Sequence, residues 1–124
     1  MKVIVVGKGG REHALVMALA ESQSAPEVYC YPGSDAIFDV AKRLPGEVSG
    51  VDSLVAAMKA EDIDLCVGGE ESWLAKGLAD QARAAGIPTW GPVSQSAQLE
   101  ASKEFAKEFM VRHSIPTGGY AAAD

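Results

Sequence analysis

The chain is poor in the features that mark several classes of protein. Its two cysteines, Cys30 and Cys66, lie far apart, without CxxC spacing or a nearby histidine, so they do not indicate a metal set. Each stands in an apolar run, and we expect both to be reduced core residues. The apolar run Val3–Val6 is too short to span a bilayer and leads into glycine and arginine, unlike a signal peptide. We therefore expect a cytoplasmic protein with no membrane segment.

Positive charge is also scarce. The 11 lysines and arginines are outnumbered by 17 acidic residues, which gives a formal net charge of −6. Nucleic acids and anionic membranes attract stripes of Lys and Arg, so the composition argues against both as general partners. Hydrophobic residues make up 48% of the 124 positions, which is typical of one folded domain with a normal core.

Short β-branched runs alternate with stretches of helical periodicity. The runs are Lys2–Val6, Glu27–Tyr31 and Ile63–Val67. Such alternation is typical of βαβ units around a buried parallel sheet. The sequence therefore predicts an α/β fold with a doubly wound parallel sheet.

The helical stretches have recognisable ends. The first helix is predicted to begin near Gly10 or Arg11, and Asp52 is the predicted N-cap of the second. A third helical stretch is predicted to end at Gly86, before an edge strand at Ile87–Trp90. The apolar positions predicted to face the core are Ala14, Leu15, Ala18 and Leu19 in the first helix, Leu54, Val55 and Met58 in the second, Leu74, Leu78, Ala82 and Ala85 in the third, and Phe105, Phe109 and Met110 in a last helix after Ser102.

The glycine turn after the first strand matches a dinucleotide fingerprint only in part. Gly7 and Gly9 fit G-x-G-x-x-G, but Glu12 occupies the third glycine position. The second strand ends in Tyr31-Pro32-Gly33, with no carboxylate for a ribose. A nicotinamide-dependent oxidoreductase is therefore disfavoured.

The same turn suits another anion. Gly9 and Gly10 allow close backbone approach, and the following helix directs its free N–H groups and positive dipole to that place. Arg11 in the first turn fits a phosphate or carboxylate partner, with Glu12 and His13 as orienting groups. The alternative is a tight strand-to-helix turn whose charged residues are merely solvated.

A second cluster follows the strand Ile63–Val67. Because the carboxyl ends of parallel strands share one edge, Gly68-Gly69-Glu70-Glu71 is predicted to face the same crevice as the glycine turn. Glu70 and Glu71 suit an amine or a cation, and they equally suit plain capping of a helix start. The residues alone leave these alternatives open, and capping is favoured for Glu71.

Several blocks together resemble one enzyme family. They are "VIVVGKGGREHALVMALA", "YPGS" and "DLCVGGEESWLAKGLADQARAAGIPTWGPVSQSAQLEASKEFAKEFMVRHSIPTGGY". In this order they resemble the N-terminal part of phosphoribosylamine–glycine ligase, an ATP-grasp family also called glycinamide ribonucleotide synthetase. The resemblance covers nearly the whole chain.

The resemblance implies a Rossmann-like pre-ATP-grasp domain. The family joins 5-phosphoribosylamine to glycine in de novo purine biosynthesis, using ATP and Mg²⁺ in the complete enzyme. It implies that Lys103 points towards the ATP phosphates, and it assigns no catalytic or metal-ligating residue to this chain. The positions that it implies for substrate binding are Gly9, Gly10, Arg11, Glu12, His13, Pro32, Gly33 and Glu70.

The resemblance also implies an organisation into parts. Residues 1–114 are predicted to form the pre-ATP-grasp domain, and residues 115–124 the start of a linker into an ATP-grasp domain, which a C-terminal domain follows. Alone, the chain is expected to be inactive and to bind no cofactor. The alternative is a non-catalytic domain of the same fold that binds a phosphorylated metabolite or serves for docking.

Overall fold

The computed structural model, which describes residues 1–91, contains a five-stranded parallel sheet in the order β3-β2-β1-β4-β5. The strands are β1 (Lys2–Gly7), β2 (Glu27–Pro32), β3 (Lys42–Arg43), β4 (Leu65–Gly68) and β5 (Thr89–Trp90). The helices are α1 (Gly10–Ala20), α2 (Val51–Ala60), α3 (Glu71–Ala75) and α4 (Leu78–Ala84), with a 3-10 turn η1 (Ile37–Asp39). This arrangement confirms the predicted α/β fold, which is Rossmann-like.

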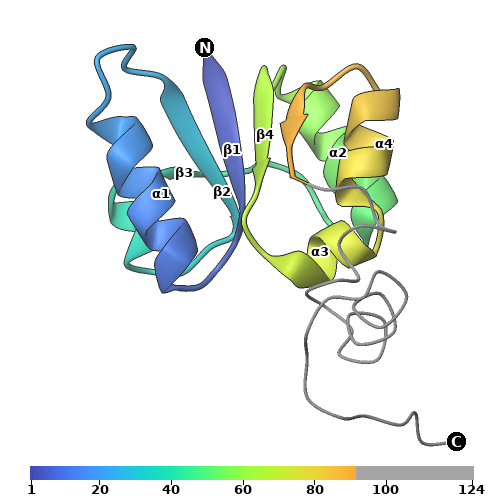
Figure 1. Ribbon diagram of the computed structural model, residues 1–124, viewed down its shortest axis with the longest axis horizontal. Helices are drawn as coiled ribbons and strands as arrows, with labels where there is room; N and C mark the ends of the chain where they lie inside the picture. The colour runs from blue at the N-terminus through green and yellow to red at the C-terminus, as the bar shows by residue number, and fades with distance from the viewer. Residues whose placement is uncertain (92–124) are drawn as a thin grey trace, which may run out of the picture.

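Helices cover both faces of the sheet, with α1 on one side and α2 and α4 on the other (Figure 1). Side chains of β1 alternate between the two layers: Val3 and Val5 pack towards α1, whereas Ile4 and Val6 belong to the cluster formed with α2 and α4. A central strand covered on both faces must be apolar at successive positions. The uninterrupted run at the start of the sequence is therefore explained by its place in the sheet.

The predicted buried face of helix α1 is confirmed in part. Leu15 and Leu19 are half-buried and pack against the core, but Ala14 and Ala18 are exposed. The buried residues of the helix are Glu12 and Val16. The prediction counted only apolar residues when it placed the stripe, and a charged residue at the start of a helix is ordinarily solvated. Glu12 and Val16 lie one helical turn apart, so the buried face of α1 is rotated relative to the predicted apolar stripe.

The predicted cap of α2 is also corrected. Gly50 is the N-cap residue, and Asp52 lies in the first turn. The Ser53 hydroxyl takes over the capping, since its Oγ accepts hydrogen bonds from the N–H groups of Ser49 at 2.8 Å and Gly50 at 3.0 Å. The predicted buried residues Leu54, Val55 and Met58 are confirmed.

The single helical stretch predicted between Gly68 and Gly86 is two helices. Gly77 has a left-handed φ of +98°, which ends α3 and starts α4. The predicted apolar stripe continues from α3 into α4, because Leu74 and Leu78 are buried in the same hydrophobic cluster. The predicted termination near Gly86 is confirmed by its N–H, which donates to the carbonyl of Arg83.

Two further predictions concern the edges of the sheet. β5 is an edge strand as predicted, and its partner is β4. At the other edge, β3 was not predicted, because a two-residue strand of Lys42 and Arg43 is too short and too polar to show an apolar pattern. The predicted last helix and the predicted domain boundary at residue 114 lie outside the described residues.

Within residues 1–91, no helix is long and apolar enough to cross a membrane.

Candidate functional site

Three strand ends meet at the carboxyl edge of the sheet. The strand register places Gly7 of β1 beside Pro32 of β2, and Val6 beside Gly68 of β4. The N–H of Gly33 donates to the Gly7 carbonyl at 3.1 Å, which ties the second loop to the first. The loops predicted to face one crevice are thus neighbours. The strand order reverses its direction between β1 and β4, the position at which open α/β sheets bind ligands.

The start of α1 lies at this switch point. Gly9 is the N-cap residue, and α1 runs for 11 residues from Gly10. The N–H groups of a first helical turn have no partner within the helix, and the helix dipole is positive there. Such a helix start has the chemistry that anions prefer, and the anion that the sequence predicts beside Gly10 and Arg11 stays a prediction.

Arg11 connects two helix starts. Its Nη2 lies 3.6 Å from Oε2 of Glu71, in the first turn of α3, and both side chains are well exposed to solvent. An exposed pair of this kind contributes little stability, about 0 to 1 kcal/mol. Glu71, favoured as a capping residue on sequence grounds, therefore also lies beside the guanidinium of Arg11, in a weak ion pair.

Glu12 is placed differently from the other predicted site residues. Its side chain is 4% exposed, and Oε2 accepts a 2.9 Å hydrogen bond from the N–H of Gly9. Glu12 is the one charged residue among residues 1–91 that is buried. Its carboxylate is thus turned back onto the loop.

Glu70 and His13 stand at the starts of two different helices. Glu70 is the N-cap residue of α3 and is half-buried. His13 stands in α1, where its N–H closes the first helical turn by donating to the Gly9 carbonyl at 3.0 Å. Both residues therefore lie on elements that begin at the carboxyl edge of the sheet.

An aromatic pair borders the site and was not predicted as part of it. The rings of Tyr31, at the end of β2, and Trp73, in α3, meet edge to face with centroids 5.7 Å apart. The Lys76 ammonium lies 5.7 Å from the centroid of the Trp73 ring. Strand alternation gave no signal for this contact, because it joins residues from distant segments.

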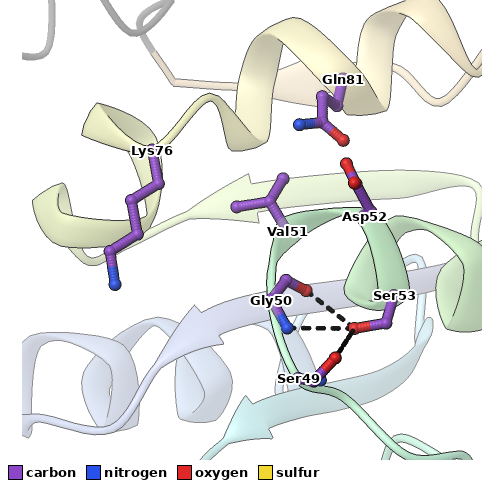
Figure 2. Close-up of a pocket in the computed structure, with 7 residues that line it drawn as sticks. All are labelled: Ser49, Gly50, Val51, Asp52, Ser53, Lys76 and Gln81. Carbon is purple, nitrogen blue, oxygen red and sulfur yellow. Dashed lines mark hydrogen bonds between the residues drawn. The ribbon is translucent and has the colours of Figure 1, made fainter.

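A separate hollow of about 410 Å³ opens at the start of α2. Figure 2 shows Asp52 of α2 and Gln81 of α4 pointing toward one another above it. Lys76 lies farther along the same rim. The Ser53 hydroxyl here is engaged by its own loop through Gly50 and Ser49. The residues that line the hollow do not include any of the glycine turn, and its serines serve the cap.

The two cysteines are buried thiols, as predicted. Burial raises the pKa of Cys30 to about 11, with the nearby Glu12 carboxylate adding to the shift. Burial alone raises the pKa of Cys66 to about 12. The Cys30 thiol donates a 3.4 Å hydrogen bond to the carbonyl of Gly7. Thiols with pKa values this high are poor nucleophiles.

The resemblance to the ligase family implies no metal-ligating residue in this chain and one ATP-binding residue, Lys103. Within residues 1–91, no cluster of three or more His, Cys, Asp or Glu side chains is arranged to hold a metal ion. The described carboxylates therefore do not fit a Mg²⁺ site. Lys103, expected near the ATP phosphates, lies outside the described residues.

Comparisons with known proteins bear on the whole chain. The family model for the phosphoribosylglycinamide synthetase N domain matches residues 1–100. Phosphoribosylamine–glycine ligase of Agrobacterium fabrum is 45% identical over 120 residues, which is 97% of this chain and 28% of that protein. The corresponding protein of Brucella melitensis is 46% identical over 120 residues, again 97% of this chain and 28% of that protein. The chain thus spans less than a third of these relatives.

Solved structures agree. The phosphoribosylamine–glycine ligase of Thermotoga maritima superposes with a TM-score of 0.61 at 29% identity, over 92% of this chain and 25% of that one. N5-carboxyaminoimidazole ribonucleotide synthetase of Thermus thermophilus gives a TM-score of 0.66 at 17% identity, over 93% of this chain and 31% of that one. At that identity the second likeness shows the fold alone.

Proposed function

Since the chain belongs to the family of phosphoribosylglycinamide synthetase N domains, we propose that it is the substrate-binding part of a ligase joining 5-phosphoribosylamine to glycine in purine biosynthesis. One observation carries the proposal: the start of α1 and Arg11 lie at the switch point between β1 and β4. Backbone N–H groups, a helix dipole and a guanidinium there match the chemistry of a sugar phosphate.

The substrate phosphate is assigned to Gly9, Gly10 and Arg11. Arg11 donates charge-assisted hydrogen bonds, which are roughly twice as strong as neutral ones. Because the guanidinium is already near Glu71, a bound phosphate competes with that carboxylate for it. The start of α1 at Gly9, Gly10 and Arg11 is therefore the part of the site that we assign to the substrate phosphate.

The amine of the substrate is assigned to the opposite side of the crevice. Glu70 begins α3 directly after β4, and its carboxylate is the predicted acceptor for the amine. Pro32 and Gly33, held to β1 by the hydrogen bond to Gly7, supply the side of the crevice next to β2. His13 completes the set on α1.

ATP and Mg²⁺ belong to the complete enzyme in this proposal. ATP supplies a phosphoryl group that activates a carboxylate, and Lys103 directs its charge towards the nucleotide phosphates. The downstream ATP-grasp and C-terminal domains are the partners of this chain. The chain alone is accordingly inactive, and we place the enzyme in the cytoplasm.

A chimera tests the proposal. The matching N-terminal segment of the Agrobacterium fabrum ligase is replaced by this chain, and ADP formation is measured with each substrate omitted in turn. We expect turnover that requires both glycine and 5-phosphoribosylamine. Turnover that is independent of either substrate, or a folded chimera without turnover beside an active parent enzyme, contradicts the assignment.

Two variants of the chimera separate the assigned roles. Arg11→Ala should raise the apparent KM for 5-phosphoribosylamine more than that for ATP, because it removes a phosphate contact. Lys103→Ala should show the opposite bias. Equal effects of both variants on both substrates would mean that the two residues are misassigned.

A further inference from the structure

The Glu12 side chain fills the space between two strand-end loops. A Cβ atom on Gly7 would lie 2.3 Å from Glu12 Cγ, and one on Gly69 would lie 2.8 Å from the same atom. Neither distance is possible between non-bonded carbon atoms, so the absence of a Cβ at Gly7 and Gly69 leaves room for the Glu12 side chain. Gly7 also has a φ of +147°, which strongly favours glycine. Glu12 is therefore packed against the ends of β1 and β4 at once.

The carboxylate end of the same side chain is fixed by the loop. Oε2 of Glu12 accepts the 2.9 Å hydrogen bond from Gly9 N–H, and a Cβ on Gly9 would lie 3.0 Å from that oxygen. The Gly69 backbone is held in turn by its N–H, which donates to the Val6 carbonyl at 3.0 Å. One side chain thus contacts three glycines from two loops.

We propose that Glu12 is a positioning residue that sets the conformation of the Gly7–Gly10 loop and fixes it to the β4 loop at Gly69. Its carboxylate acts through the Gly9 amide and not on a ligand. In a dinucleotide fingerprint this position is the glycine that allows helix and strand to pack closely. Here the position carries a side chain that fills the gap and closes the loop.

The consequence for binding follows from geometry. The N–H groups of Gly10 and Arg11 are aimed by the loop that precedes them, and a loop held in one conformation binds its ligand without a cost for ordering it. Affinity at the start of α1 should thus depend on a residue that does not touch the ligand. This binding consequence rests on the proposed function, whereas the ordering of the loop does not.

A matched pair of variants tests the inference in the 124-residue chain. Glu12→Gln keeps the length and an oxygen acceptor for Gly9 N–H, whereas Glu12→Met keeps the length and volume with only a weak acceptor. Glu21→Gln and Glu21→Met, at the exposed end of the same helix, are the controls. The readouts are amide hydrogen exchange of Gly9 and Gly69 by NMR and titration with ribose 5-phosphate.

We expect Glu12→Met to speed exchange of the Gly9 amide about tenfold or more, and to weaken ribose 5-phosphate binding by a similar factor, as for loss of a hydrogen bond to a charged group. Glu12→Gln should stay within about threefold of the wild type in both readouts, because a neutral acceptor retains the bond. The Glu21 variants should change neither.

Two results would overturn the inference. Unchanged Gly9 and Gly69 exchange in a folded Glu12→Met variant would show that Glu12 does not order the loops. Binding lost in Glu12→Gln with Gly9 exchange intact would show that the carboxylate contacts the ligand. If the wild-type chain fails to bind ribose 5-phosphate, the proposed function loses its support, while the exchange measurements still decide the role of Glu12. Should Glu12→Met not fold, Gly9→Ala, which crowds Oε2, supplies the exchange test.

Discussion

The hydroxyl of Tyr29 donates a 2.8 Å hydrogen bond to Oε1 of Glu61 and so joins strand β2 to the end of α2. Lys2 and Lys42 each place an ammonium 6.0 Å from the centroid of the Tyr29 ring. Burial, with the hydrogen bond to Glu61 second, raises the pKa of Tyr29 to about 12. The phenol therefore remains a donor over the whole neutral range.

Removing this hydroxyl should destabilise the fold. We expect Tyr29→Phe to lower the free energy of unfolding by roughly 1.5 kcal/mol, the scale of a hydrogen bond to a charged group, measured by urea denaturation. In a cycle with Glu61→Ala, which removes the acceptor, the two effects should not add, because both variants remove the same hydrogen bond. Additive effects would show that the bond contributes nothing.

Stability should also depend on pH through Glu61. The hydrogen bond from Tyr29 is the main cause that lowers the pKa of Glu61 below 4.5, helped by Lys2 and opposed by partial burial. A carboxyl with a lowered pKa in the folded state stabilises the fold above its unfolded pKa, and loses this contribution as pH falls through the folded value.

The corresponding measurement compares urea midpoints of the wild type and Glu61→Gln from pH 7 to pH 2.5. We expect the wild type to be more stable at pH 7 and the difference to shrink below about pH 4.5, the ordinary pKa of this group. A difference that stays constant through this window would contradict the lowered pKa.

The thiols should resist modification in the folded state. With a pKa of about 11 in place of 9.0, Cys30 has roughly 100-fold less thiolate at pH 8 than an ordinary cysteine, and only the thiolate reacts. We expect slow labelling of both cysteines by a disulfide reagent in buffer and rapid labelling of both in urea. Rapid native labelling of Cys30 alone would mean that the glycine loop opens readily.

Arg83 should protect the outer edge of β5, which is an edge strand among residues 1–91. Its Nη2 donates to the carbonyls of Thr89 at 2.9 Å and Gly91 at 2.7 Å, groups that an edge strand otherwise offers to another chain. We expect Arg83→Ala to lower the free energy of unfolding by about 1 kcal/mol and to increase self-association in sedimentation equilibrium. Arg83→Lys, which retains the charge, should be intermediate in both measurements. An Arg83→Ala variant with unchanged stability and unchanged self-association would show that Arg83 does not protect this edge.

Glu71 should modulate the affinity of the candidate site. Glu71→Gln removes the carboxylate charge 3.6 Å from Arg11, which removes one competitor of an incoming phosphate for the guanidinium. We expect ribose 5-phosphate to bind two- to fivefold more tightly, on the order of one exposed ion pair, with the unfolding free energy nearly unchanged. Exposed Glu47→Gln is the control, and weaker binding in Glu71→Gln would place Glu71 among the ligand contacts.

The fold was predictable because its signals are local and periodic. The apolar run at Val3–Val6 and its counterpart ending at Val67 predicted central strands, and the parallel arrangement then brought their loops to one edge. β3 was missed because Lys42 and Arg43 form a two-residue strand without an apolar pattern. The break at Gly77 was missed because the apolar spacing continues across it.

The candidate site was predictable in position and less so in detail. The sequence placed Gly9, Arg11 and Glu70 at one edge, and the strand register supports this neighbourhood. The burial of Glu12 was not predictable, since it depends on space left by Gly69, which is distant in the sequence. The binding roles of all these residues stay predictions until a ligand is measured.

The place of β1 in the middle of the sheet has a consequence for how the domain assembles during synthesis. β2 joins β1 on one side and β4 joins it later on the other, so each new strand of the sheet adds to a partner that has already left the ribosome. Among the five strands that the structure describes, none waits unpaired for a distant later strand to be inserted beside it. The sheet grows outward from its oldest strand, an order that limits the time for which apolar edges are open to aggregation.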